Sequence, residues 1–212
     1  MYLRNIHAES HIPTLRQFMR DHPLGTLTTA ITSSEYPFLQ TSHIPGVELK
    51  DEVLVLFTGP VHHYVSPKFY TDTKPTTGKV VPTWNYAAVQ AYGRATVYFD
   101  SGEASTDYLS QQISDLSQHA ETAVMGYTGG DKQGPWKVSD APDRYIAIMQ
   151  KAIIGIKIDI TRLGGKFKMS QEMGEKDRAG VIDGFESLGT EVGAEAARMV
   201  AERQELMKGV RS

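Results

Sequence analysis

The order of strand-like and helical segments constrains the fold of this chain more than any single motif. Runs rich in β-branched residues dominate the first hundred residues, whereas helical spacing dominates the second half. The regular alternation of strand and helix that is typical of a parallel doubly wound sheet is missing. The order therefore predicts a mainly β fold with peripheral α-helices, in which an antiparallel sheet closes into a barrel. The expected strands are residues 24–32, 38–45, 51–59, 65–70, 78–100 and 153–163, and the expected helices are residues 10–22, 105–123, 141–153 and 189–209.

Prolines mark two expected boundaries. The first helix should end at His22, because the residue before a proline is pushed out of the helical region. Pro82 cannot donate a hydrogen bond to a sheet. Residues 78–100 are therefore expected to form either a strand pair or one long strand with an edge, bulge or bend at Pro82. Residues 164–189 are polar and punctuated by glycine, and they favour no single element.

Composition limits the classes of protein to consider. The chain has 212 residues, enough for one good-sized domain, and its formal net charge of −3 gives no electrostatic reason to bind nucleic acid or an anionic membrane. The absence of cysteine excludes disulfides and thiolate metal sites. The first residues lack the apolar core of a signal peptide, and no apolar run reaches the ~18–20 residues of a membrane span. We therefore expect a cytoplasmic protein without a membrane partner.

The stretch KVVPTWNY, residues 79–86, is the first candidate site. A strand-like run ends at a proline, and a hydroxyl, an indole, an amide and a phenol follow without a break. Such groups could form the rim of a pocket in which an aromatic ligand stacks and accepts hydrogen bonds. The alternative is that Trp84 belongs to the core, while Thr83 and Asn85 are turn residues. The residues alone favour neither interpretation.

The stretch GPVHHYVSPKFY, residues 59–70, is the second candidate. Ser66, Lys68 and the backbone near Gly59 could bind a phosphate, although an ordinary polar turn explains the same residues. His62 and His63 point to opposite faces of an extended chain, so they do not form a two-ligand metal site by themselves.

A third candidate is GGKFKMSQ, residues 164–171. In a strand, Lys166, Lys168 and Ser170 share one face and could bind an anion. A solvated edge strand protected by lysines is the alternative. Nucleophilic catalysis has little support, because the G-x-S-x-G, G-x-G-x-x-G and P-loop patterns are absent.

Taken together, these segments resemble a known family. The matching stretches, in order, are HPLGTL, TSHIP, LFTGPVHHYVSPKFY, GKVVPTWNYAAVQAYG, WKVSDAP, GGKFKMSQ and DRAGVI. They resemble the PaiB-like FMN-binding split-barrel proteins, also called FMN-binding negative transcriptional regulators, and the wording of the second candidate site resembles the fungal branch. The resemblance spans residues 1–188, which are expected to form the split-barrel domain, and residues 189–212 are expected to form a C-terminal helix.

The resemblance implies an antiparallel split β-barrel that forms a homodimer and binds FMN in clefts at the dimer interface. It also implies which residues would contact the cofactor, but it leaves catalytic residues unknown and implies no metal. The implied cofactor-binding residues are His43, Ser66, Pro67, Tyr70, Thr83, Trp84, Asn85, Tyr86, Lys168, Ser170 and Gln171.

The chain departs from the family pattern after residues 41–45. There TSHIP runs directly into GVELKDEVLVLF, whereas the family continues through a strand that carries a G-H-L-A-R-A-N-P motif. The missing motif contains an arginine and an asparagine suited to a flavin phosphate. Its absence weakens the expectation that FMN is bound.

The resemblance and the missing segment together suggest three functions. The first is FMN binding with a flavin-dependent redox reaction on a small molecule. The second is a transcriptional regulator, although the acidic residues of the C-terminal helix offset its basic ones and the net charge does not favour DNA. The third is a repurposed cleft for haem or another small aromatic ligand, with His43, His62 and His63 as candidate ligands or acid–base groups.

Overall fold

The computed structural model describes residues 3–30, 39–41 and 52–209 of the chain. The chain folds into two compact units. The first consists of Met1–Thr28, Leu54–Tyr92 and Ile160–Ser212, and the second consists of Thr29–Val53 and Gly93–Asp159. The candidate segments that the structure describes all fall within the first unit.

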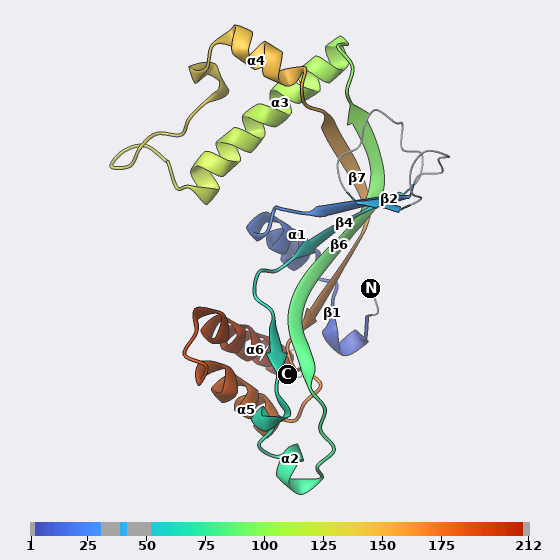
Figure 1. Cartoon of the computed structure of the whole chain (residues 1–212), viewed down its shortest axis with the longest axis vertical. Helices are drawn as coiled ribbons and strands as arrows, with labels where there is room; N and C mark the ends of the chain where they lie inside the picture. The colour runs from blue at the N-terminus through green and yellow to red at the C-terminus, as the bar shows by residue number, and fades with distance from the viewer. Residues whose placement is uncertain (1–2, 31–38, 42–51, 210–212) are drawn as a thin grey trace. The chain divides into compact units, whose positions relative to one another are not determined.

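One sheet organises the described strands. Its order is β1-β7-β6-β4-β2-β3, and β5 pairs with β6 beside that path (Figure 1). The pairs β1–β7, β2–β4 and β5–β6 are antiparallel. The predicted antiparallel sheet with helices around it is confirmed, and the described strands form an open path, as in a split barrel. The strands are β1 (Ala8–Glu9), β2 (Thr26–Ala30), β3 (Leu39–Thr41), β4 (Glu52–Thr58), β5 (His63–Val65), β6 (Thr83–Tyr98) and β7 (Gly155–Lys168).

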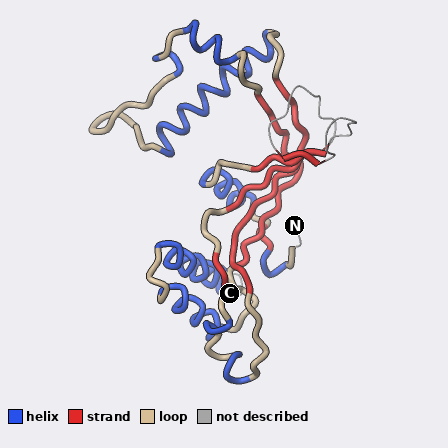
Figure 2. Tube along the Cα trace, viewed as in Figure 1, coloured by secondary structure: helices blue, strands red, loops and turns tan. Residues whose placement is uncertain are grey.

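The helices complete the described elements (Figure 2). Helix α1 ends at Asp21 with His22 as its C-cap, as Pro23 predicts. The π-helical turn η3 (Ala120–Val124) continues α3 directly. None of the described helices is long and apolar enough to cross a membrane. The α-helices are α1 (Ile12–Asp21), α2 (Thr73–Thr76), α3 (Glu103–His119), α4 (Asp143–Gln150), α5 (Glu175–Glu186) and α6 (Glu191–Gly209), and the 3-10 helices are η1 (Asn5–His7), η2 (Pro67–Phe69) and η4 (Val138–Asp140).

Several expected boundaries were wrong. Residues 78–82 precede the sheet and β6 is a single long strand, so Pro82 lies just before its first residue, where no ladder donor is needed. The expected strand 65–70 is the 3-10 helix η2, because Pro67 follows a serine that caps the turn. Strand β7 continues to Lys168, and the unassigned segment that follows contains α5. The strand expected over residues 38–45 lies partly outside the described residues.

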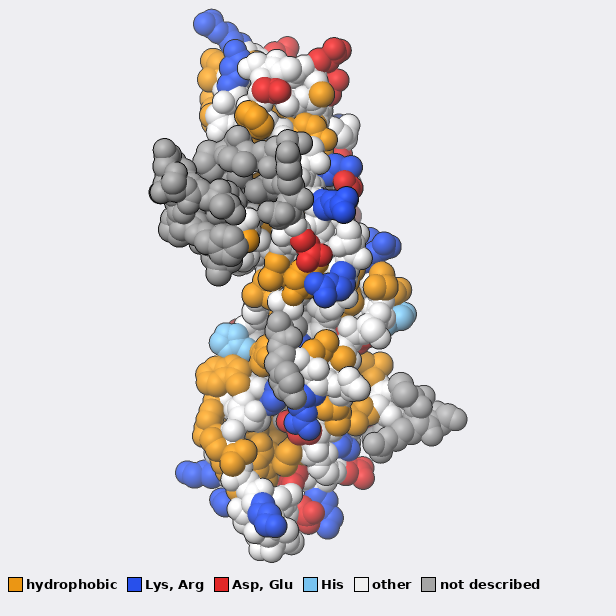
Figure 3. All heavy atoms as spheres, turned by 90° about the vertical axis from the view of Figure 1, so that its right-hand side faces the viewer, with side chains coloured by type: hydrophobic (Ala, Val, Ile, Leu, Met, Phe, Trp, Pro, Cys, Tyr) orange, Lys and Arg blue, Asp and Glu red, His pale blue; other side chains and the backbone are white. Residues whose placement is uncertain are grey.

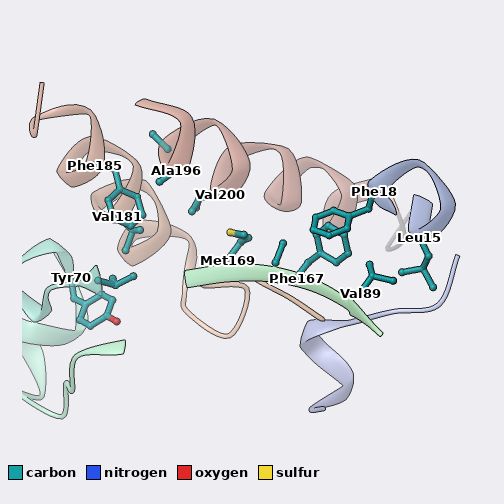
Figure 4. Close-up of a cluster of buried hydrophobic side chains, with 13 residues drawn as sticks. Leu15, Phe18, Tyr70, Val89, Phe167, Met169, Val181, Phe185, Ala196 and Val200 are labelled. Carbon is teal, nitrogen blue, oxygen red and sulfur yellow. The ribbon is translucent and has the colours of Figure 1, made fainter. Parts of the chain in front are cut away.

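The core of the first unit lies between the sheet and the helices α1, α5 and α6 (Figure 4). Phe167 on β7 points toward the helices, and its ring meets that of Phe18 edge-on at 5.2 Å. Val200 on α6 and Met169 lie between the helix and the sheet. Each fully buried side chain of this size contributes about 1.5–3 kcal/mol. Because side chains alternate along a strand, burying Phe167 on one face places its neighbours Lys166 and Lys168 on the other.

The second unit contains the helices α3 and α4. Tyr98 at the end of β6 stacks on Tyr108 of α3 with ring centroids 3.9 Å apart. Gln150 at the end of α4 donates a hydrogen bond to Ser110 of α3. These contacts tie both helices to one another and α3 to the strand from which it follows.

Candidate functional site

The residues Thr83–Tyr86 open β6, and strand alternation divides them between two environments. Trp84 is 48% exposed, whereas Asn85 is only 2% exposed. Neither of the two sequence-based interpretations therefore holds for the whole stretch. Trp84 lies at the surface, as expected of a pocket rim, and Asn85 belongs to the interior.

Trp84 belongs to an exposed group of rings, which we call the aromatic wall and define as His62, Tyr64 and Trp84. The register of β5 on β6 places Tyr64 opposite Trp84, and their ring centroids are 6.3 Å apart. The indole Nε1 of Trp84 donates a hydrogen bond to Nδ1 of His62 at 3.3 Å. Tyr64 is 43% exposed. A flat ligand would find two adjacent aromatic rings here, since aromatic groups favour stacked and edge-on contacts.

Exposed apolar surface on the chain is not confined to this wall. Hydrophobic side chains gather on the lower half of the face seen in Figure 3. Val81, which comes shortly before β6 in the chain, is 73% exposed. Exposed apolar side chains therefore also precede β6, at Val81 and Pro82.

Lys168 connects the ends of β6 and β7. Its ammonium donates to the hydroxyl of Thr83 at 2.6 Å and to the backbone carbonyl of Trp84 at 3.2 Å. The same ammonium lies 3.5 Å from a carboxylate oxygen of Glu172. Lys166, two residues earlier, lies 5.1 Å from the ring centroid of Tyr86 and is 9% exposed. The structure thus places Lys166 over the ring of Tyr86 and Lys168 beside Thr83 and Trp84.

Glu172 joins this group to the N-terminal segment. His7 is 2% exposed, and its Nε2 lies 3.0 Å from the second carboxylate oxygen of Glu172. Burial raises the pKa of Glu172, but the hydrogen bond from His7 and the charge of Lys168 outweigh burial, so that the pKa lies below the usual value. Glu172 is therefore an ionised partner of Lys168 at neutral pH.

Ser170 and Gln171 shape the turn that follows β7. Ser170 adopts a left-handed backbone with φ of 60°, and its hydroxyl is paired with the amide of buried Asn85. The side-chain oxygen Oε1 of Gln171 accepts the N–H of Met169 at 2.6 Å, and its side-chain Nε2 donates to the backbone carbonyl of Phe167. The expectation that Ser170 continues the face of the two lysines was wrong, because the strand ends at Lys168.

The turn that contains Ser66, Pro67 and Tyr70 is held against α5. Ser66 accepts the N–H of Lys68 at 3.2 Å and so caps η2. Tyr70 is 4% exposed and belongs to the core, where burial raises the pKa of its hydroxyl, as do the nearby carboxylates of Glu172 and Asp177. Within one chain, the side chain of Tyr70 is therefore a packing group.

Two glycines of α5 allow this helix to pack closely against the same turn. A Cβ at Gly180 would collide with the carbonyl oxygen of Phe69, and one at Gly184 would collide with its ring. Asp177, which is 1% exposed, accepts the N–H groups of Asp72 and Thr73 at 2.8 and 3.1 Å. The stretch DRAGVI thereby fixes the backbone that leads from the aromatic wall to α2.

The histidines give no metal centre among the described residues, which contain no group of three potential ligands. His62 is bound to Trp84, and Nδ1 of His63 lies 2.9 Å from the carbonyl oxygen of Tyr64. The ring of His63 packs edge-on against Phe185. His43 lies outside the described residues.

The sequence analysis did not single out Tyr64, Glu172, His7 or Asp177 as parts of the site. Tyr64 could have been found from the register of the short strand β5 on β6. Glu172 stands four residues after Lys168, a spacing that suits an ion pair on a helix, but these residues are not helical. The pairing of Glu172 with His7, 165 residues apart, leaves no signal in the sequence.

Comparisons with known proteins show the family to which the chain belongs. A family described as "Putative FMN-binding domain" matches residues 1–50 and 46–162. An uncharacterised protein of Aspergillus fumigatus is 54% identical over 257 aligned positions, which cover 97% of this chain and 98% of that protein. The protease synthase and sporulation protein PAI 2 of Bacillus subtilis is 30% identical over 136 positions, which cover 64% of this chain and 56% of that protein. The flavocytochrome Anf3 of Azotobacter vinelandii is similar in structure with a TM-score of 0.46 and 11% identity, over 84% of this chain and 78% of that one.

The comparisons also bear on the missing segment. The two matches to the family meet at residues 46–50, close to where the sequence departs from the family pattern. The alignment with the Aspergillus protein is longer than the 212 residues of this chain, so the relative carries residues that have no counterpart here. This chain is therefore shorter than the aligned part of that relative.

Proposed function

The chain belongs to the FMN-binding domain family, of the PaiB-like type, and from that premise we propose that it binds a flavin against the aromatic wall and acts as a flavin-dependent oxidoreductase on a small molecule. The flavin ring would lie against Trp84 and Tyr64. Lys166 and Tyr86 would border it on the neighbouring part of the face.

The observation that carries this proposal is the exposed pair Tyr64 and Trp84. Single exposed apolar residues are common on protein surfaces. Two large rings set opposite one another by strand register, both more than two-fifths exposed, form a prepared surface for a flat aromatic ligand. The residues of this face fit the flavin ring system well. They fit a phosphate poorly, because Lys168 is already bound within the chain.

A bound flavin would supply the redox chemistry, since hydride and electron transfer belong to that cofactor. The chain would contribute binding and orientation. Trp84 is itself oriented by His62, and the strand pair β5–β6 holds both rings on ordered backbone. Ser66, Pro67 and Tyr70 would act through the shape of the turn that leaves β5.

We further propose a homodimer. The wall of one chain is open to solvent on the side away from the sheet, so a ligand stacked there would be covered on one face only. A second copy would cover the other face and exclude water, as expected for a ligand site with most of its surface buried. Sedimentation of the purified protein should show twice the mass of the chain, and a monomer at all concentrations would contradict this part.

The two alternative functions receive less support. Arg198 of the C-terminal helix is paired with both Glu195 and Glu202, which offsets its charge toward DNA. The histidines His62 and His63 are engaged within the chain, which does not favour haem ligation. We therefore retain flavin binding as the single proposed function.

The test is a binding experiment with the two tryptophans as a matched pair. Purified protein should show flavin absorbance, or a higher melting temperature when FMN or riboflavin is added. Trp84→Ala should weaken flavin binding about tenfold, as expected for the loss of one stacking partner. Trp136→Ala is the control, because Trp136 is similarly exposed at 43% but lies in the second unit. No binding of either flavin, or equal effects of both substitutions, would contradict the proposal.

A further inference from the structure

We propose that this chain recognises the flavin ring and does not select for its phosphate, so that riboflavin and FMN bind with similar affinity. The inference rests on the proposed function, because it concerns the same site. It follows from the contacts that the cationic and hydroxyl groups near the aromatic wall already make within the chain.

Lys168 is the first of these groups. A lysine ammonium has three N–H donors, and it has no others to offer. In this chain the ammonium meets three acceptors, which are the Thr83 hydroxyl, the Trp84 carbonyl and the Glu172 carboxylate. Its side chain is only 14% exposed. A phosphate could reach Lys168 only by displacing one of these partners.

Glu172 makes that displacement unfavourable. Its carboxylate carries a negative charge at neutral pH and is held in place from the other side by His7. A phosphate dianion that approached Lys168 would meet this carboxylate within a few ångströms. Like charges in a partly buried site repel more strongly than in water. The Lys168–Glu172 pair therefore presents little net positive charge to an anion.

The other groups that could bind the flavin phosphate do not take the place of Lys168. Lys166 is 9% exposed, and its ammonium lies over the ring of Tyr86. The hydroxyl oxygen of Ser66 accepts the N–H of Lys68 within its own turn. The side chain of Lys68 is exposed, and an exposed lysine contributes little to an ion pair because water and salt screen it. Among the described residues of this face, no cation is both exposed to the ligand and held in place for a phosphate.

The first experiment needs no variant. Titration of the full-length protein with riboflavin and with FMN, followed by tryptophan fluorescence or calorimetry, should give dissociation constants within about threefold of each other. FMN binding more than about tenfold tighter than riboflavin binding, the gain expected from one well-placed charge-assisted hydrogen bond, would overturn the inference while leaving the proposed function intact. Binding of neither flavin would overturn both.

The second experiment tests the part played by Glu172. In Glu172→Gln the carboxylate charge is removed and the side-chain volume is kept, so Lys168 becomes able to attract an anion. FMN should then bind about tenfold more tightly, with riboflavin unchanged. Glu9→Gln is the matched control, because Glu9 forms a similarly buried pair with Arg203 away from the wall. An equal change in both flavins, no change in FMN, or the same change in the control would overturn the assignment to Glu172.

Discussion

Tyr64 and Trp84 face one another across the β5–β6 pair, and both rings remain exposed. A cross-strand aromatic pair normally gains stability by burying its rings against the sheet and its neighbours. Here the pair stabilises a short strand and also leaves ring surface uncovered. The same two residues therefore connect the local stability of β5 with the proposed ligand surface.

The coupling between these rings can be measured directly. Tyr64→Ala, Trp84→Ala and the double variant form a cycle in which the rings should contribute about 0.5–1 kcal/mol jointly to the free energy of unfolding. Urea denaturation of the four proteins checks this value. A coupling energy indistinguishable from zero would show that the rings do not support one another in solution.

Gly184 should tolerate no side chain. A Cβ there would overlap the ring of Phe69, so Gly184→Ala must move either α5 or the η2 turn. We expect a loss of about 1–3 kcal/mol in the free energy of unfolding, as for other overpacked sites. Gly164→Ala serves as the control, because a Cβ there meets nothing within 4 Å. Equal stabilities of the two variants in chemical denaturation would contradict the close approach.

The carboxylate of Asp177 should stabilise the fold by accepting hydrogen bonds from backbone N–H groups. Asp177→Ala leaves the partly buried N–H groups of Asp72 and Thr73 without their acceptor, which should cost about 1–2 kcal/mol. Asp183→Ala on the same helix is exposed and should change stability by less than about 0.5 kcal/mol. The comparison is made from urea midpoints. A small effect at Asp177 would mean that water replaces the lost acceptor.

Glu172 should make the stability of the protein depend on acidic pH. Its pKa is lowered on folding, so its ionised form favours the folded state above the unfolded pKa, and this contribution is lost as the pH falls through the folded pKa. Wild type should exceed Glu172→Gln by about 1 kcal/mol near neutral pH, a modest value because solvent screens a partly exposed carboxylate. The difference should shrink below the usual glutamate value of 4.5. A difference that stays constant from pH 7 to acid would show that the charge is not responsible.

Much of the candidate site could be predicted because it depends on local pattern. The polar residues after Pro82 stood out, and strand alternation separates Trp84 from Asn85 without any structure. The buried positions of Tyr70 and Gln171 could not be predicted in this way. Tyr70 packs in one cluster with residues of α5 and α6, which lie far away in the sequence, and Gln171 bonds within the turn after β7, whose left-handed Ser170 no residue pattern predicts.

The sequence by itself determined most of the sheet-forming runs and the end of α1 at His22, and it showed that Lys166 and Lys168 would share one face of a strand, because these follow from backbone sterics and from residue periodicity. Only the tertiary structure decided that Tyr64 meets Trp84, that Ser170 turns inward to Asn85, and that Glu172, held by His7, pairs with Lys168. The physical reason is that the charge a ligand experiences is set by neighbours in space. A lysine that suggests an anion site in the sequence is, in the folded chain, already half of an ion pair.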